Sequence, residues 1–228
     1  KATAVLKKLV ERYPHSVLGY YYLGQTAAAA KQLDQAETYY QKALSLNPQS
    51  ELVLLDLALV YEMQKKTTQA REVYQKALAI NPRSEQVRKR LGRLYLGQKK
   101  LDDALHQFRV LEKIEADPQD TRLKISLIYR EKGNYEKAGT ELNLVLAAQP
   151  NNHRARYFLG VIYTEAKDDE KAAVELLRIP PDSEYFADSR VYLSYIYQRQ
   201  EKLDQAIAEV ERALNAKKDD LDLLGFLA

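Results

Sequence analysis

The side chains that most often hold metals or act as nucleophiles are scarce in this chain. Its three histidines, His15, His106 and His153, lie in different repeats, and none has a second histidine at the spacing of a metal site. Cysteine is absent, which excludes disulfides, thiolate zinc sites and cysteine nucleophiles. We therefore expect no metal site.

Acidic pairs and glycines also lack the patterns of catalytic or nucleotide-binding sites. Asp102-Asp103, Asp168-Asp169 and Asp219-Asp220 lie at expected turns or helix starts, where negative charge interacts favourably with the helix dipole. The eight glycines form no G-x-G-x-x-G or G-x-x-x-x-G-K cluster, and no G-x-S-x-G or H-E-x-x-H motif is present. The sequence therefore predicts a protein that is not an enzyme and that binds no cofactor.

The charge and hydropathy of the chain argue against several kinds of partner. Its 35 basic and 32 acidic residues give a net charge of +3, too balanced for a general nucleic-acid binder or a polybasic membrane protein. Apolar runs are only a few residues long, so we expect no membrane insertion, and the first residues do not resemble a signal peptide. A chain without cysteine suits the cytoplasm and the periplasm equally. Because an initiator methionine is missing, we expect a piece of a longer protein.

A period of 34 residues runs through the chain without insertion or deletion. This period predicts the helices that position the side chains discussed above. Alanine recurs at Ala2, Ala36, Ala70, Ala104, Ala138, Ala172 and Ala206. Leucine or isoleucine recurs at Leu23, Leu57, Leu91, Ile125, Leu159, Leu193 and Leu227, each followed by a small residue. Tyrosine recurs at Tyr61, Tyr95, Tyr129, Tyr163 and Tyr197. Such a period indicates stacked repeats, and the small residues indicate closely crossing helices.

Each unit of this period predicts two amphipathic helices. In 51–84 the first helix carries an i, i+3, i+4, i+7 apolar stripe, formed by Leu54, Leu57, Ala58 and Tyr61. The second helix carries a stripe at the same spacing, formed by Ala70, Tyr74, Ala77 and Leu78. Prolines 48, 82 and 150 are expected to end second helices, and Ser50 and Ser84 suit the N-caps of the helices that follow.

These residues resemble the tetratricopeptide repeat (TPR) family over essentially the whole chain. In 17–50 the family pattern is present, with Ala27 in place of tyrosine, as Tyr20, Leu23-Gly24, Ala36, Tyr40, Ala43 and Pro48. The resemblance implies an all-α fold, a right-handed superhelical solenoid of about six helix pairs with half-repeats at both ends. It also implies one array over 1–228, of a plain bacterial type. Its parts are a half-repeat at 1–16, repeats at 17–50, 51–84, 85–118, 119–152, 153–186 and 187–220, and the start of a further repeat at 221–228.

Two departures from the family pattern lead to expectations about local structure. Gly133 matches the family's inter-helix turn, whereas the other turns carry Lys31, Lys65, Lys99, Lys167 or Glu201. These turns should need no left-handed residue, or should carry modest strain. In 153–186, Pro180-Pro181 should end the second helix near Ile179 and leave 182–186 as a non-helical connection. Tyr185 or Phe186 would then either fill the space of the missing turn or form an exposed aromatic contact.

In the family, first helices line a concave groove in which peptides or short helices bind. By resemblance, the candidate partner-binding residues are Tyr21, Leu55, Leu59, Lys89, Arg93, Lys124, Arg130, Arg154, Tyr157, Tyr192 and Tyr195. This surface should be apolar, then basic, then aromatic along the chain. Eight other tyrosines occupy positions that the family buries, which argues against a base-stacking surface and hence against a nucleic-acid partner.

The basic stretch is similar in part to the two-carboxylate clamp with which some family members hold acidic C-terminal tails. Lys89 and Arg154 match two of its cations, but Arg93 and Lys124 replace its asparagines, and Phe158 replaces its last arginine. The stretch could hold an acidic segment of a partner. Alternatively, it could be neutralised by acids on or near the same surface, which are Asp56, Glu62, Asp120, Glu131 and Asp188.

The resemblance implies a non-enzymatic scaffold for protein–protein interaction, with a partner peptide or protein in the groove. A first alternative is self-association as a homo-oligomer through the uncapped, apolar segment 221–228 and the segment 1–14. RNA binding, known in related helical repeats, is a second alternative. A third is that the chain is the regulatory part of a larger protein whose catalytic domain lies elsewhere.

Overall fold

The computed structural model describes residues 2–216, which form thirteen α-helices and no strand. The chain divides into two compact units, Lys1–Glu115 and Ala116–Ala228. The first unit contains α1 (Ala2–Arg12), α2 (Val17–Ala29), α3 (Leu33–Leu46), α4 (Glu51–Met63), α5 (Thr67–Ile80), α6 (Glu85–Gly97) and α7 (Leu101–Glu112). The second unit contains α8 (Gln119–Glu131), α9 (Tyr135–Ala148), α10 (His153–Glu165), α11 (Asp169–Leu177), α12 (Phe186–Arg199) and α13 (Leu203–Ala216). The expected all-α fold is confirmed.

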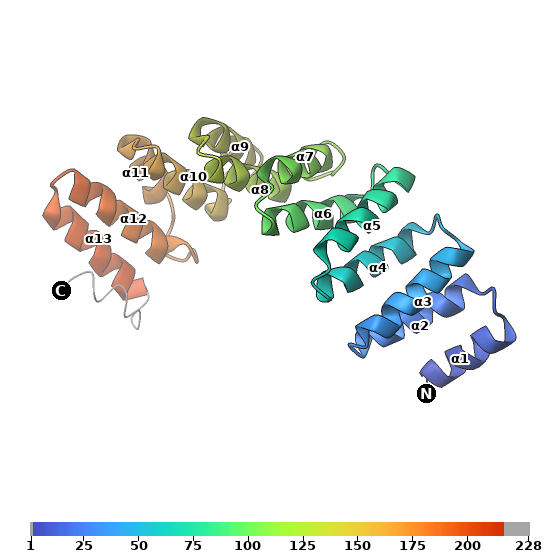
Figure 1. Cartoon of the computed structure of the whole chain (residues 1–228). Coiled ribbons are helices and arrows are strands. Elements are labelled where there is room, and N and C mark those ends of the chain that lie inside the picture. The colour runs from blue at the N-terminus through green and yellow to red at the C-terminus, as the bar shows by residue number, and fades with distance from the viewer. Residues whose placement is uncertain (1, 217–228) are drawn as a thin grey trace. The chain divides into compact units, whose positions relative to one another are not determined.

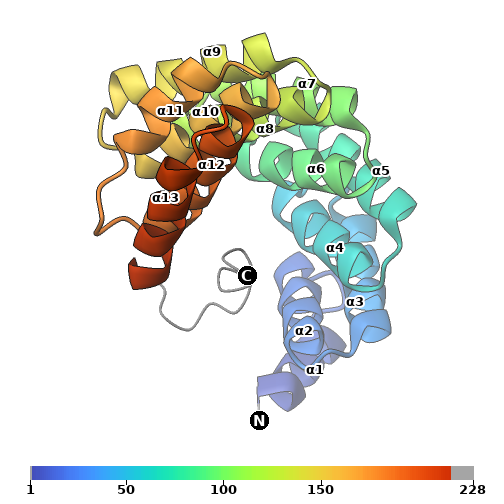
Figure 2. The same ribbon diagram turned by 90° about the vertical axis from the view of Figure 1, so that its left-hand side faces the viewer.

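Within each unit the helices form antiparallel pairs joined by short turns (Figure 1). Figure 2 shows one such pair, α12 and α13, side by side. A first helix also packs against the second helix that precedes it, as α10 does against α9 and α4 against α3. Within each unit, consecutive pairs are thus held together by contacts between neighbours along the chain, which is how stacked repeats are stabilised.

The two helices of a pair cross most closely at the small residue after the ladder leucine. A Cβ atom added to Gly24 would lie 2.5 Å from Cε1 of Tyr40, and one added to Gly160 would lie 2.6 Å from Cγ of Leu176. Both distances are far below van der Waals contact, so a side chain at these positions would force the helices apart. Close crossing therefore explains the small residues, as expected.

Five turns between paired helices contain a left-handed residue that is not glycine. The φ angle is 58° at Lys31, 61° at Lys65, 56° at Lys99, 62° at Lys167 and 60° at Glu201. At the equivalent position, Gly133 has a φ of 71°. A left-handed conformation costs an L-residue about 1–2 kcal/mol. The sequence left two possibilities for these turns, and the φ angles agree with the second, which is modest backbone strain.

Helix ends follow the sequence signals, except that two expected N-cap serines do not cap through their side chains. α3, α5 and α9 end two residues before a proline, as predicted. Ser50 and Ser84 do occupy the N-cap positions of α4 and α6, but neither side chain accepts a backbone hydrogen bond there. Side chains that do cap are Ser16, Asn134, Asn152 and Asp168.

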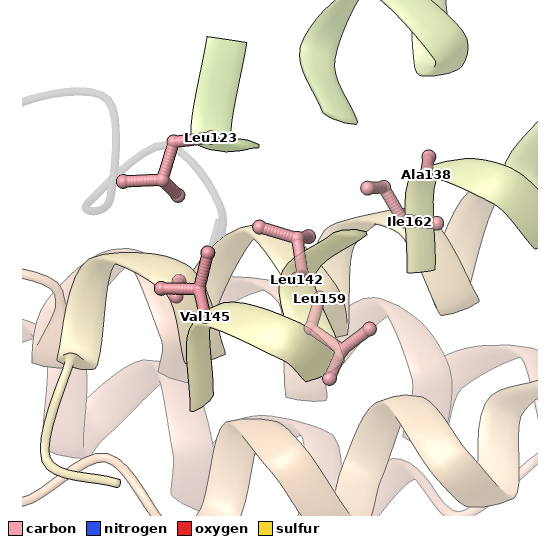
Figure 3. Close-up of a cluster of buried hydrophobic side chains, with 7 residues drawn as sticks. Leu123, Ala138, Leu142, Val145, Leu159 and Ile162 are labelled. Carbon is pink, nitrogen blue, oxygen red and sulfur yellow. The ribbon is translucent and has the colours of Figure 1, made fainter. Parts of the chain in front are cut away.

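A buried cluster in the second unit shows how the ladder residues pack. Its members come from the three consecutive helices α8, α9 and α10 (Figure 3). They are Leu123, Ala138, Leu142, Val145, Ala155, Leu159 and Ile162. Tyr129 and Tyr163, from the tyrosine ladder, pack at its margin. Because the cluster includes a helix from the following repeat, no single pair buries its apolar face alone.

The proline pair shortens α11 to nine residues, and α12 begins at Phe186. The connection therefore ends at Tyr185, one residue earlier than expected. Tyr185 and Phe186 pack against a buried cluster that includes Leu176, Ile179 and Leu193. Their expected role in filling the space of the missing helical turn is confirmed.

A ladder of arginines, which the sequence analysis missed, joins helices within and between repeats. Arg88, Arg122, Arg156 and Arg190 recur at the 34-residue period. Nη1 of Arg88 donates to Oε1 of Gln107 at 2.9 Å, and Nη1 of Arg156 donates to Oε2 of Glu175 at 2.6 Å, each across 19 residues. Nη1 of Arg190 lies 3.5 Å from Oε2 of Glu209 in the same arrangement.

The same guanidinium groups also bind backbone carbonyls in the last turn of the preceding second helix or within two residues after it. Arg88 donates to Pro82, Arg156 donates to Pro150, and Arg190 donates to Leu176 and Ile179. Each of these arginines therefore connects its own pair to the helix before it. In repeats 17–50 and 51–84 the corresponding pairs are apolar or aromatic, Tyr20 with Tyr39 and Leu54 with Val73.

Candidate functional site

The first-helix face of the first unit is formed by α2, α4 and α6. Two of its expected groove residues are core residues instead, since Tyr21 is 5% exposed and Leu55 is 6% exposed. Leu59 is half-buried. The assignment of Tyr21 and Leu55 to partner contact is therefore corrected, because packing within the unit covers both side chains. The exposed apolar side chains of α2 and α4 include Leu18, Tyr22 and Leu52.

A polar network holds the Tyr21 hydroxyl on this face. Nε2 of Gln25 lies 2.5 Å from the Tyr21 hydroxyl and donates to Oδ2 of Asp56 at 3.1 Å. Burial, and then the negative charge of Asp56, raise the pKa of Tyr21 to about 12. Gln25 and Asp56 line a hollow of about 330 Å³ together with Tyr40, Leu59 and Met63. Its polar groups already bond to one another, so the hollow offers few free groups to a ligand.

Of the two cations expected on α6, Lys89 is engaged within the unit. Nζ of Lys89 lies 2.6 Å from Oε1 of Glu115 and 3.4 Å from Oε2 of Glu85, and the bond to Glu115 raises the pKa of Lys89. Arg93 is exposed and forms no ion pair with another described residue. The expected neutralising acid Asp56 bonds to Gln25 instead, and Glu62 accepts a hydrogen bond from Tyr74.

The first-helix face of the second unit is formed by α8, α10 and α12. Nε of Arg130 donates to Oε2 of Glu165 at 2.8 Å, and Nη2 of Arg130 donates to the other carboxylate oxygen. This hydrogen bonding raises the pKa of Arg130. Nζ of Lys124 donates to the backbone carbonyl of Asp120 at 3.2 Å.

The Arg130–Glu165 pair borders a hollow in this face. The hollow measures about 530 Å³ and is lined by Leu127, Arg130, Glu131, Tyr135 and Glu165. Glu131 was expected to neutralise the basic stretch, but the acid that binds Arg130 is Glu165. The groove positions taken from the family omit the thirteenth residue of each repeat, which Glu165 occupies. The position one residue further along the first helix is therefore the signal in the sequence that points to Glu165.

Three aromatic rings gather around Tyr157 on α10, and we call the four residues the Tyr157 cluster: Tyr157, Phe158, Tyr185 and Tyr192. The Tyr185 ring stacks on Tyr157 at 5.3 Å and 28°. The Tyr192 ring meets Tyr157 edge-on at 5.9 Å and 75°, and Phe158 lies 5.5 Å away. Burial, followed by interaction with Tyr192, raises the pKa of Tyr157. Tyr157 and Tyr192 were expected on this face, whereas Tyr185 reaches it only because the proline pair ends α11.

Two further side chains extend the Tyr157 cluster toward solvent. The guanidinium of Arg154 lies 5.8 Å from the centroid of the Phe158 ring, within the range of a cation–π interaction. Arg154 is exposed and has no ion pair among the described residues. Tyr195, one turn from Tyr192 on α12, is 43% exposed. A partly buried aromatic surface thus lies beside an exposed cation.

Residues 2–216 contain neither a candidate metal site nor a candidate membrane span. No group of three or more histidine, aspartate or glutamate side chains there is arranged to hold a metal ion. No helix in the same range is both long and apolar enough to cross a bilayer.

Comparison with known sequences places the chain in a family. Tetratricopeptide repeat profiles match residues 15–83, 61–127, 129–184 and 187–220, which together span most of the chain. The chain belongs to the tetratricopeptide repeat family. No curated protein sequence matches this TPR array.

Solved structures with a similar fold are distant in sequence. The C-terminal part of a TPR repeat-containing protein from Cytophaga hutchinsonii has a TM-score of 0.84 at 14% identity, over 100% of this chain and 93% of that one. YrrB, a TPR protein with an unusual peptide-binding site, has a TM-score of 0.64 at 16% identity, over 82% and 96%. PilW, a widely conserved type IV pilus biogenesis factor, has a TM-score of 0.64 at 19% identity, over 93% and 98%. At these identities the likeness concerns the fold.

Proposed function

We propose that this TPR array is a non-enzymatic scaffold that binds a peptide or an extended segment of a partner protein. The observation that carries the proposal is the Tyr157 cluster with Arg154 beside it, on the first-helix face of the second unit. Tyrosine rings offer a large, rigid contact area that loses little entropy on binding. A peptide-binding site in YrrB, which shares the fold, supports the same use of the scaffold.

The chemistry of this face favours a peptide that combines an apolar or aromatic side chain with an acidic residue. The apolar side chain would pack against the Tyr157 cluster and the exposed ring of Tyr195. The acidic residue would pair with Arg154, because a guanidinium binds a carboxylate through two parallel hydrogen bonds. The first unit is a weaker candidate for the same ligand, since Glu115 already binds Lys89 at 2.6 Å.

Selection from a displayed random-peptide library tests this proposal. Enriched peptides would be synthesised, and their affinities measured by titration calorimetry for the wild-type chain and for an Arg154→Glu, Tyr195→Ser variant. Both replaced side chains are exposed, so the fold should persist. We expect the variant to bind at least about tenfold more weakly, the loss typical of a central interface residue.

The matched control is Arg83→Glu, which makes the same charge change at an exposed arginine of the first unit. It should bind like the wild type. Failure to enrich any peptide, or equal affinities for all three proteins, would contradict the proposed function. Enrichment of peptides without acidic residues would support the peptide-binding function but contradict the proposed pairing of Arg154 with an acidic residue.

A second candidate function is self-association, and the observation that favours it is on α13. Leu203 and Ile207 lie one turn apart and are 61% and 49% exposed. The segment 221–228, also expected to self-associate, lies outside the described residues. Analytical ultracentrifugation of the wild type and of Ile207→Lys tests the idea. A dimer that dissociates in the variant would support it, and a wild-type monomer at high concentration would end it.

A further inference from the structure

The ion pair between Arg130 and Glu165 lies on the surface proposed above for peptide binding, and the inference drawn from it rests on that proposed function. The pair bridges α8 and α10, two first helices of consecutive repeats. Both oxygens of Glu165 face the guanidinium, at Nε and at Nη2. This is the two-point geometry in which arginine binds any carboxylate. The carboxylate of Glu165 therefore occupies the edge of Arg130 that a peptide carboxylate would take if it bound Arg130 in addition to, or in place of, Arg154.

We propose that Glu165 is an internal competitor, which a ligand carboxylate must displace from Arg130. The hollow beside the pair has about 530 Å³ of room, enough for an acidic side chain, and Leu127 and Tyr135 supply its apolar walls. The side chains of Arg130 and Glu165 are 36% and 30% exposed, so water and solutes reach both partners. A partly exposed ion pair contributes little to stability, and opening it leaves Glu165 next to solvent.

Comparison with another ion pair of the same unit separates this role from a structural one. Arg156 and Glu175 also pair closely, at 2.6 Å, but both side chains are only 14% exposed. Arg156 is further tied to the Pro150 carbonyl, so its guanidinium is committed on two sides. Among residues 2–216, the guanidinium of Arg130 donates hydrogen bonds to Glu165 alone. The Arg130 pair is thus the one of these two that a ligand can open without disturbing the helix pair.

The consequence for binding is selectivity. A ligand that offers only a carboxylate gains one ion pair at Arg130 and loses another, so its net gain is small. A ligand that also contacts the Tyr157 cluster or Tyr135 gains apolar contact that Glu165 cannot replace. The internal competitor therefore favours peptides with both features over free acids, and its removal should weaken that preference.

Side-chain NMR of the full chain tests the competitor directly. The probe is sodium acetate, titrated against sodium chloride at constant ionic strength, and the signal is the Nε–H resonance of Arg130, assigned with an Arg130→Lys variant. Three proteins are compared: wild type, Glu165→Gln and Glu131→Gln. Glu131 lines the same hollow and is exposed without an ion pair among the described residues, so its replacement makes the same charge change but frees no guanidinium edge.

We expect acetate to bind Glu165→Gln at least about threefold more tightly than the wild type, the effect expected when a partly exposed ion pair is removed. Glu131→Gln should respond like the wild type. Equal responses of all three proteins would overturn the proposal, and so would a similar gain in both variants, which would indicate a general charge effect. Circular dichroism melting of each variant checks that the fold is intact.

A second readout separates this proposal from the proposed function. An acidic peptide selected on the wild-type chain should bind Glu165→Gln more tightly and Glu131→Gln unchanged. A peptide that binds the wild type and Glu165→Gln equally would remove the competitor and leave the scaffold function in place. A third outcome is that no peptide binds any of the three proteins while acetate binding at Arg130 still differs among them as expected. The role of Glu165 as a competitor would then be supported, and the proposed peptide-binding function would be rejected.

Discussion

At the scale of single residues, the left-handed turns make a clear prediction. Lys65 has a φ of 61° and an exposed side chain, so Lys65→Gly removes backbone strain without removing a buried contact. Glycine offsets part of this gain by its greater freedom in the unfolded chain. We expect the free energy of unfolding to rise by roughly 0.5–1 kcal/mol, measured by urea denaturation.

The converse substitution provides the control. Gly133 has a φ of 71° and no atom within 4 Å of an added Cβ, so Gly133→Ala introduces strain and no clash. It should lower the free energy of unfolding by about 1 kcal/mol. Two changes of the same sign would show that the turns are not strained in solution.

Tyr21 predicts how stability depends on pH in alkaline solution. Its pKa is about 12 in the folded chain, and an unfolded tyrosine titrates near 10. Between these values the unfolded state has lost the proton and the folded state retains it, so stability is complete below pH 10 and falls as pH rises toward 12. The loss from Tyr21 has a slope of up to about 1.4 kcal/mol per pH unit.

Tyr21→Phe isolates this contribution, because phenylalanine has no proton to lose. Unfolding free energies measured in denaturant from pH 9 to 12 should decline less steeply in this variant than in the wild type. Tyr22→Phe, at an adjacent tyrosine that is 48% exposed, serves as the control and should keep the wild-type slope. Parallel curves for Tyr21→Phe and the wild type would contradict the buried setting of the Tyr21 hydroxyl.

Single residues also show where reasoning from sequence succeeds and where it stops. Gly24 and Gly160 were explained correctly, because helix crossing leaves one geometric solution at that position. Tyr21 and Leu55 were assigned to the surface, because a helical position predicts a direction but not how far the neighbouring side chains cover it. Glu165 was missed as the partner of Arg130, since charge pairing between repeats depends on side-chain reach and not on the period.

At the scale of helices, the arginine ladder predicts a double-mutant result with a control inside the chain. Arg156 and Glu175 occupy the positions that Leu54 and Val73 occupy in an earlier repeat. Arg156→Leu leaves Glu175 without its closest partner and the Pro150 carbonyl without a donor, and should lower the free energy of unfolding by about 2–3 kcal/mol. Adding Glu175→Val copies the apolar pair and should restore stability to within about 1 kcal/mol of wild type.

Chemical denaturation of the wild type, both single variants and the double variant measures the coupling. Additive losses, with the double variant the least stable, would mean that the ion pair does not determine how these two helices fit together.

The early end of α11 is a feature of a helix that the sequence did predict. Pro180-Pro181 indicated the end of the helix to within two residues of its observed end at Leu177. The packing of Tyr185 and Phe186 into the vacated space was also anticipated. The stacking of Tyr185 on Tyr157 was not, because it depends on the path of the chain through a turn that has no repeat counterpart.

At the scale of the whole molecule, the two compact units predict independent folding. The first comprises Lys1–Glu115 and the second Ala116–Ala228. In stacked repeats, stability is roughly the sum of each repeat and its contacts with adjacent repeats, so a fragment that keeps several pairs keeps most of both. We expect each fragment, produced alone, to be helical by circular dichroism and to unfold cooperatively on heating. An unfolded fragment would show that this unit does not fold independently.

The period alone was enough to predict an all-α chain of stacked helix pairs, because three ladders constrain every repeat at once. Binding chemistry was less predictable. The exposed groove residues are less constrained by packing, so their roles depend on pairs such as that of Lys89 with Glu115, a residue in the connection between two helices.

The spacing of the arginine pairs bears on how such an array can grow and shrink over evolutionary time. Each arginine and its partner lie 19 residues apart within one repeat, as Arg88 and Gln107 or Arg156 and Glu175 do. A gene duplication or deletion of one whole repeat therefore transfers or removes both members together. No copy inherits a buried arginine without its partner. The later repeats can therefore be duplicated as units without leaving a buried charge unpaired, which would be destabilising.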